Sequence, residues 1–180
     1  MKKLSVIAIA VAGLAFGSSA VAAGESTISI GYAQSDVDFD GFSPKDDPRG
    51  VNLKYRYEMD DNWGMIGSFT YTGSDSSYSA GNERASLDLT YYSLTVGPVY
   101  RFNEYISAYA LVGVAHGKAE VEYENSSVRA WGEEKRTDLA GGVGLQFNVT
   151  PDFAIDASYE YTALDSVDVG TWALGLGYRF

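Results

Sequence analysis

The chain has 180 residues, with 13 Lys and Arg against 24 Asp and Glu, so its formal net charge is −11. It contains no cysteine, which excludes disulfide scaffolds, thiolate metal sites and cysteine nucleophiles. A single histidine argues against a zinc site, and the acidic balance argues against nucleic acid as a partner. The 14 tyrosines and 20 glycines are a bias toward β-structure.

The start of the chain has the layout of a cleavable secretory signal. A basic beginning is followed by an apolar run over 4–16 and then by small residues. The run is too short to span a bilayer comfortably, and no stop-transfer charges follow it. Cleavage after Ala22 and cleavage after Ala23 both fit the preference for small residues. We therefore expect a signal peptide at 1–23 and one exported domain at 24–180.

The exported part alternates between apolar and polar residues, which is the period of β-strands. In the clearest stretch, apolar Val51 and Leu53 alternate with polar Asn52 and Lys54. Polar, turn-rich segments separate the stretches. We expect eight strands, at 27–32, 51–59, 65–71, 92–101, 108–122, 138–148, 153–161 and 171–180.

The fifth stretch is ambiguous, because its first half is apolar on both faces. Its phase is taken from the charged half, where His116, Lys118 and Glu120 share the even positions. This choice places the odd positions, which include Tyr109 and Leu111, on the apolar side. His116 then lies on the polar face.

Alternation alone does not separate a soluble sandwich from an outer-membrane barrel, but the polar faces do. They mix charges of both signs with glycine and small polar residues. In a small barrel such residues point inward and pair, while the apolar face meets lipid. The charges expected to form this lumen network are Lys54, Arg56, Glu58, Arg101, Asp156, Glu160 and Arg179.

The predicted fold is therefore an all-β, closed, eight-stranded antiparallel up-and-down transmembrane barrel. Short periplasmic turns alternate with longer extracellular loops, as in outer-membrane barrels. The loops are expected near 34–49, 73–88, 123–136 and 163–168. The interior of such a barrel is wide enough only for side chains, so an ion-paired plug is expected rather than a pore. Pro98 cannot donate to a ladder, and we expect a bulge there.

Several strand motifs resemble one family of small barrels. These motifs lie at 31–36, 52–58, 67–72, 97–101, 144–148, 166–172 and 177–180. Together they resemble the OmpX/Ail/PagC/Lom family of outer-membrane proteins, and the strand motifs look nearest to OmpX. The resemblance implies residence in the outer membrane of a Gram-negative bacterium. Members of the family serve adhesion to host cells, cell entry or complement resistance, and some have no settled role.

The last strand suggests a further partner. Leu174, Leu176, Tyr178 and Phe180 alternate up to the end of the chain. This pattern looks like the signal that outer-membrane assembly machinery reads, and an edge strand of this kind suits β-augmentation. The same pattern also suits a plain lipid-facing strand, and both interpretations can hold together.

The loops carry aromatic residues and arginines, which are the usual anchors of protein interfaces. We name six as candidate partner-binding residues: Phe39, Phe42, Tyr78, Arg84, Arg129 and Trp131. The leading functional hypothesis is a cell-surface protein whose loops bind host extracellular or complement proteins. The rival is a structural barrel for envelope homeostasis, whose loops meet lipopolysaccharide. Strands four to six could also run past the membrane and offer an unpaired edge to a partner.

Enzymatic and metal-binding alternatives are weaker. His116 lacks a nucleophile elbow of the form Gly-x-Ser-x-Gly, so no enzyme is expected. Asp36, Asp38 and Asp40 precede Gly41 much as in a calcium loop, but no Glu stands at the twelfth position. We expect no cofactor, a monomer, and contacts with outer-membrane lipid, lipopolysaccharide and the assembly machinery.

Overall fold

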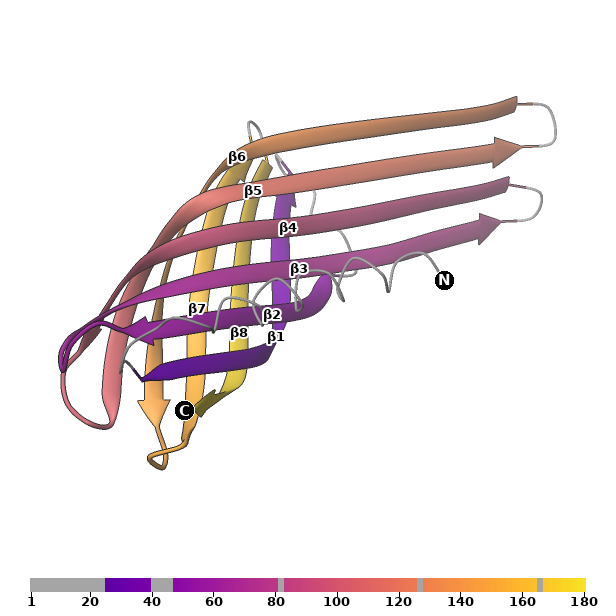
Figure 1. Ribbon diagram of the computed structural model, residues 1–180. Helices are drawn as coiled ribbons and strands as arrows, with labels where there is room; N and C mark the ends of the chain where they lie inside the picture. The colour runs from indigo at the N-terminus through magenta and orange to yellow at the C-terminus, as the bar shows by residue number, and fades with distance from the viewer. Residues whose placement is uncertain (1–24, 40–46, 81–82, 126–127, 165–166) are drawn as a thin grey trace.

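A computed structural model describes residues 25–39, 47–80, 83–125, 128–164 and 167–180. All of its regular structure is β, and each strand pairs antiparallel with its neighbours until β8 closes on β1. Figure 1 shows the closed wall and its strand order. The strands are β1 (Ser26–Phe39), β2 (Arg49–Glu58), β3 (Trp63–Ala80), β4 (Glu83–Arg101), β5 (Ile106–Asn125), β6 (Val128–Asn148), β7 (Phe153–Leu164) and β8 (Val167–Arg179).

The predicted alternation places side chains on the two faces of the wall as expected in seven of the eight strands. In β1, Ile30 is 62% exposed on the outside, whereas Thr27 is 1% exposed on the inside. The same division holds in β8, where Leu176 is exposed and Thr171 is buried. An apolar outer face around a polar interior is the reverse of a soluble sandwich and suits a wall surrounded by lipid.

The phase predicted for β5 is wrong. Tyr109 and Leu111 are buried in the barrel, while Val112 and Val114 are exposed on its outer face. The charged residues used to set the phase lie beyond the lipid-facing part of the strand. There the outer face is polar, so charge no longer marks the inside. His116 consequently faces outward, in the same phase as Val114.

Four strands are much longer than the rest. β3, β4, β5 and β6 run on together past the ends of the other strands, as Figure 1 shows. The loops predicted at 73–88 and 123–136 are therefore wrong, because the described residues of both segments are strand, paired as far as Ala80 with Glu83 and Asn125 with Val128. Their serines and charges looked like loop composition, although strands in water tolerate polar residues on both faces. The extension predicted for strands four to six is observed relative to the closed wall, and β3 extends with them.

Pro98 does not produce the expected bulge. Val96 pairs with Val112 and Val99 with Tyr109, so the β4–β5 register is the same on both sides of the proline. Pairing lapses only between these two positions. β4 and β5 approach closely here, as the position of Gly97 shows. A Cβ added to this glycine would lie 1.8 Å from the carbonyl oxygen of Ala110. The chain accommodates the missing donor by a local gap in the ladder rather than by an extra residue.

The short-turn end also holds both ends of the described chain. Ser26 and Phe180 exchange two backbone hydrogen bonds of 2.9 Å. In the first turn, the Asp60 carboxylate accepts hydrogen bonds from the backbone N–H groups of Asn62 at 2.9 Å and Trp63 at 2.7 Å. These bonds lower the pKa of Asp60. Within the described ranges, no helix has the length and apolar character needed to cross a membrane.

The close approach at Gly97 generates a prediction. Gly97→Ala should lower the free energy of unfolding by about 1–3 kcal/mol, because the methyl group must push two strands apart. Gly67→Ala is the matched control, since nothing lies within 4 Å of its Cβ position. Urea titration of the protein folded in lipid vesicles would compare the two. Equal unfolding midpoints for both variants would contradict this packing argument.

Candidate functional site

The middle of the lumen is organised around one carboxylate. Asp156 of β7 is 1% exposed and forms an ion pair with Lys54 of β2 from across the barrel. The hydroxyl of Tyr109 on β5 donates to the same carboxylate, at 2.9 Å from each oxygen. Lys54 also donates to Ser158 at 2.9 Å and lies 5.8 Å from the centre of the Tyr109 ring. Three strands are thereby linked through the interior.

A second cluster lies at the end with the short turns, where three arginines surround Glu58. Arg101 forms an ion pair with its carboxylate, and Arg56 and Arg179 approach it at 3.3 Å. Glu25, just before β1, contacts Arg101 at 3.9 Å and forms an ion pair with Arg179. Three guanidinium groups therefore share two carboxylates, one buried and one 60% exposed.

The third buried acid has different neighbours. Glu160 is 5% exposed and accepts a 2.7 Å hydrogen bond from Tyr91 and a 3.4 Å bond from Thr95. Among the described residues, no Lys or Arg lies within ion-pair distance of it. The positive surplus is thus near the turns, while Glu160 lies toward the opposite end.

Apolar side chains and hydroxyl groups fill much of the remaining interior. Ile66, Val99 and Leu111 pack with the Tyr109 ring in one buried cluster. Nearer the loops, Ser35 bonds Thr72 at 2.8 Å and Thr171 at 2.7 Å.

The structure places all seven side chains predicted for the charge network inside the barrel, and it adds two that sequence reasoning missed. Glu25 was overlooked because it precedes the alternating part of the first strand. Tyr109 was assigned to the outer face with the rest of its strand. A signal for Tyr109 was present in Gly144, its direct partner on β6, because a Cβ there would lie 2.3 Å from the tyrosine ring.

The six candidate partner-binding residues are not gathered at one point. Phe42 lies outside the described residues. For the other five, the backbone alone is described: Phe39 ends β1, Tyr78 lies in β3, Arg84 in β4, and Arg129 and Trp131 in β6. The register places Arg84 and Arg129 on either side of Glu124. Tyr78 pairs instead with Ala85.

His116 is not a lumen residue. Its ring lies 5.0 Å from the ring of Tyr92 on the outer face, and Nδ1 is 2.6 Å from the Thr137 hydroxyl. Among the described residues, the ring has this hydroxyl and no carboxylate as a hydrogen-bond partner. Within the described residues, no group of three or more histidine or acidic side chains could hold a metal ion.

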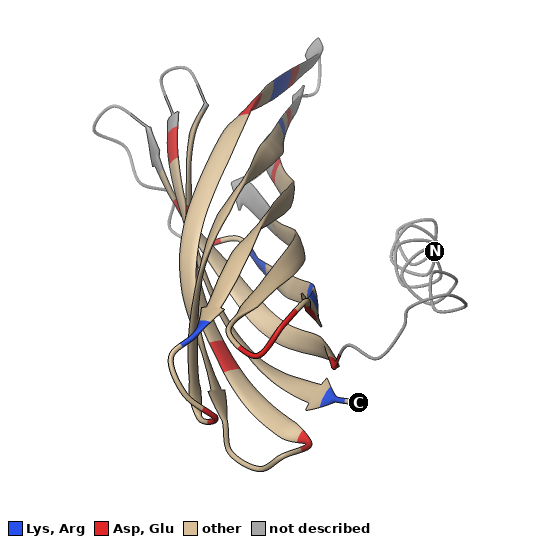
Figure 2. Ribbon diagram, turned by 60° about the vertical axis from the view of Figure 1, so that its left-hand side comes forward, with Lys and Arg blue, Asp and Glu red and all other residues tan. Residues whose placement is uncertain are grey.

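The strand register aligns charged residues across the long strands. Asp75, Asp88, Glu120 and Glu133 occupy one row across β3, β4, β5 and β6. Lys118 and Lys135 are paired in the next row toward the barrel. Lys118 contacts Glu120 at 2.9 Å, so the two rows are linked. Figure 2 shows charged residues mainly toward the strand ends, with much of the wall between them uncharged.

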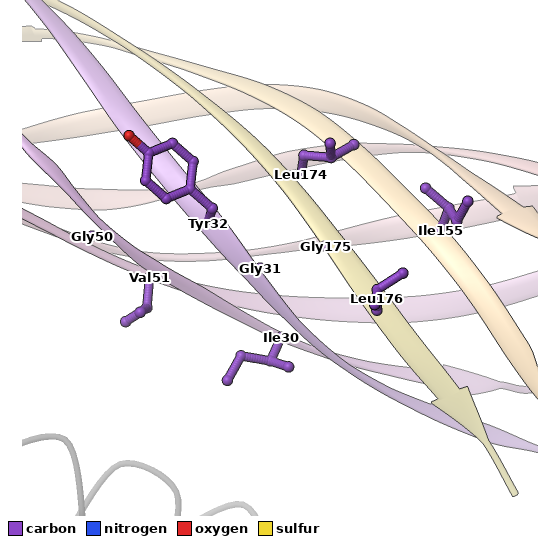
Figure 3. Close-up of a pocket in the computed structure, with 9 residues that line it drawn as sticks. All are labelled: Ile30, Gly31, Tyr32, Gly50, Val51, Ile155, Leu174, Gly175 and Leu176. Atoms are coloured by element: carbon purple, nitrogen blue, oxygen red, sulfur yellow. The ribbon is translucent and has the colours of Figure 1, made fainter.

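A hollow with a volume of about 580 Å³ lies on the lipid-facing side of the wall. In Figure 3, apolar side chains rise around the backbone of Gly31, Gly50 and Gly175. The other lining residues are Ile30, Tyr32, Val51, Ile155, Leu174 and Leu176. Gly31 and Gly175 pair directly between β1 and β8, and the side chains beside them leave the shallow space open. With no charged side chain in its lining, the hollow suits hydrocarbon.

A closed β-wall, an apolar exterior and an ion-paired interior define the class of outer-membrane β-barrels. The chain belongs to that family: residues 7–180 match the family described as "Outer membrane protein beta-barrel domain". It is located in the outer membrane of a Gram-negative bacterium.

Individual relatives show which outer-membrane β-barrels this chain is similar to in sequence and structure. The attachment invasion locus protein of Yersinia enterocolitica is 52% identical over 183 residues, covering 100% of both chains. Outer membrane protein X of Escherichia coli K12 is 41% identical over 182 residues, again covering both chains fully. The crystal structure of Ail from Yersinia pestis, in complex with the heparin analogue sucrose octasulfate, has a TM-score of 0.80. It is 53% identical, and the match covers 88% of this chain and 100% of that one.

The Lys54–Asp156 pair generates a prediction. Asp156→Asn should cost about 3–5 kcal/mol of unfolding free energy, because it leaves a buried ammonium group without its counter-charge. Replacing both partners, as Lys54→Met with Asp156→Leu, should cost less than the single change, since no charge is then stranded. Urea unfolding in lipid vesicles measures both. If the single variant were as stable as the unmodified protein, the pair would not be holding the lumen together.

Proposed function

We propose that the protein is a cell-surface adhesin that binds its partner through the projecting sheet formed by β3–β6. One observation carries this proposal: four strands continue together well past the point where the barrel closes. β3 pairs with β2 only up to Gly73, and β6 pairs with β7 only from Ala140. The residues beyond form a sheet that needs no lipid contact, which suits a role outside the membrane.

The projecting sheet has two edges available for pairing. The ladders leave 74–80 of β3 and 128–139 of β6 without a described neighbour on their outer sides. Unpaired strand edges are templates for adding a strand from another protein. The name of the Yersinia enterocolitica relative, "Attachment invasion locus protein", supports attachment as the outcome of such binding. Complement proteins are further candidate partners through the same edges.

The charge of the projection favours a protein partner over a sulfated polysaccharide. Residues 74–90 and 117–137 contain eight Asp and Glu but five Lys and Arg. The acidic row at Asp75, Asp88, Glu120 and Glu133 lies across all four strands. The Yersinia pestis relative holds a heparin analogue, so a polyanion is the competing ligand class. Here a surplus of carboxylates would repel such a ligand.

A second candidate function is contact with lipopolysaccharide, without a host partner. The observation that favours it is the Lys118–Lys135 pair, in the first row beyond the aromatic row of Tyr92 and His116. Cations just outside a lipid-facing band are well placed for the phosphates of lipopolysaccharide headgroups. Such contacts would anchor the base of the sheet and are compatible with adhesion by its tip.

We further propose non-enzymatic roles for the remaining predicted features. The lumen charges close the barrel as a plug, residues 1–23 are a signal peptide, and Leu174, Leu176, Tyr178 and Phe180 form the signal for outer-membrane assembly. The exposure of these last four side chains on β8 and at its end supports their being readable before the barrel closes. The first residue of the mature protein, Ala23 or Gly24, can be determined by mass spectrometry.

Removing the projection while keeping the barrel tests the adhesin proposal. Residues 76–87 and 121–132 would each be replaced by Asn-Gly, which joins Asp75 to Asp88 and Glu120 to Glu133 through two-residue hairpin turns. Both hairpins then end at the same row. Bacteria lacking their own homologue, with short lipopolysaccharide, should adhere to epithelial cells with the full barrel but only at background level with the shortened one.

Three controls separate the alternatives. Surface amounts of the two barrels are matched, so a difference reports binding rather than assembly. Lys118→Gln with Lys135→Gln should leave adhesion unchanged if the partner binds the strand edges. Loss of adhesion on adding soluble sulfated polysaccharide would reassign the partner to that class. Equal adhesion by the full and shortened barrels would overturn the proposal in favour of a structural role.

A further inference from the structure

Among the described residues, almost all the buried side-chain N and O atoms without a hydrogen-bond partner lie in one layer of the lumen. Seven such side-chain atoms occur among the described residues, and Ser93 Oγ is the only one outside this layer. The other six are Nε of Arg56, Arg101 and Arg179, Nε2 of Gln146, and the hydroxyl oxygens of Thr27 and Ser107. Four of the six are N–H donors that cannot accept a hydrogen bond.

The strand register explains why these atoms lie together. Thr27 is directly opposite Arg56 on one side and Arg179 on the other. Ser107 is likewise opposite Arg101 and Gln146. The two halves of the layer are joined across the barrel, because Arg56 donates to the Gln146 side-chain oxygen at 3.1 Å.

The charge of the layer is positive. Arg56, Arg101 and Arg179 share Glu58 and Glu25 as their carboxylate partners. Glu58 is buried, but Glu25 is 60% exposed. Arg101 and Arg179 are each 15% exposed, so the layer opens toward the short-turn end of the barrel. Unpartnered donors are costly when buried, and a surplus of guanidinium charge favours an anion over water as their partner.

We propose that this layer is a binding site for a small oxyanion, entered from the periplasmic end. Arg56, Arg101 and Arg179 supply charge, and Gln146, Thr27 and Ser107 supply neutral hydrogen bonds. Glu25 acts as a tethered competitor, because its carboxylate already contacts two of the arginines at the entrance. Phosphate groups and carboxylates share the required chemistry.

The test uses the mature protein, labelled with ¹⁵N, in nanodiscs of uncharged-headgroup (zwitterionic) lipid at constant ionic strength. Inorganic phosphate, sulfate and acetate are titrated separately, with chloride as the reference anion. Saturable amide shifts are expected at Thr27, Glu58, Arg101 and Ser107, and not at Glu134 on the projecting sheet. The phosphate and acetate arms distinguish a phosphate ligand from a carboxylate ligand.

Variants locate the site. Arg101→Gln should weaken phosphate binding at least about tenfold, because it removes a charged donor. Arg136→Gln is the control, since it makes the same charge change on the projecting sheet and should leave binding unchanged. Glu25→Gln should tighten binding by about two- to fivefold, which is the effect of removing an exposed ion-pair partner. Glu25 is largely exposed, so this variant tests the site even where an arginine variant fails to fold.

Three results would overturn the proposal. Shifts that grow linearly with every anion, chloride included, would mean that the layer holds water alone. If Arg101→Gln and Arg136→Gln weakened phosphate binding equally, the binding would depend only on the net charge of the protein and not on this layer. Unchanged affinity in Glu25→Gln would place any bound anion away from the arginines at this entrance.

Discussion

Closure of β1 on β8 is the constraint on which the rest of the molecule depends. In hydrocarbon, a backbone N–H or C=O without a partner is too costly to keep, so a sheet can cross a lipid bilayer only if it has no edge. The β1–β8 register runs from Thr27↔Arg179 to Phe39↔Val167, which spans the wall from the turns to the loops. Closing eight strands fixes a narrow interior that must be filled. The polar residues of the inner face therefore have to find partners among themselves.

The same constraint ends where the lipid ends. Beyond the closed wall, water can satisfy a strand edge, and β3–β6 extend there without neighbours on their outer sides. The barrel thus supports a four-stranded sheet with two unpaired edges, which would be too costly in the part of the wall that lipid surrounds. Charges on the outer face, such as Asp88 and Glu120, mark this change of surroundings. The same four strands therefore meet lipid along the closed wall and water in the projecting sheet. Both candidate surface functions belong to the part in water.

The sequence was sufficient for the architecture wherever lipid imposed alternation. Strands such as β2 and β8 have one apolar and one polar face, so their position and orientation could be predicted directly. Prediction failed where the solvent changed along a strand. In β5, the charges at His116, Lys118 and Glu120 indicate an inward face by the rule that holds in lipid, but beyond the closed wall they indicate only contact with water. Serine-rich hairpin ends looked like loops for the same reason.

The candidate sites were also only partly predictable from the sequence. The lumen charges could be named from their phase alone, but their pairing could not, because it depends on barrel stagger. No pattern in the sequence indicates that Glu58 meets arginines from three strands, or that Asp156 faces Lys54 and Tyr109. Glu25 lies outside any alternating pattern. Residue type alone suggests the partner-binding candidates, and the register places those that are described along strands rather than around one centre.

The interior network has a consequence for the order of assembly. Arg179 meets Glu58 across a separation of 121 positions, and Lys54 meets Asp156 across 102. Arg179 lies on β8, so its contact with Glu58 needs the final strand, whereas Lys54 on β2 and Asp156 on β7 need the wall to curve until they face each other. A partly built wall would therefore expose unpaired guanidinium and carboxylate groups to hydrocarbon. Half-assembled barrels are therefore penalised far more than in a soluble protein, where water would solvate the same charges. Insertion should be nearly all-or-none, with the last strand committing the whole chain to the membrane at once.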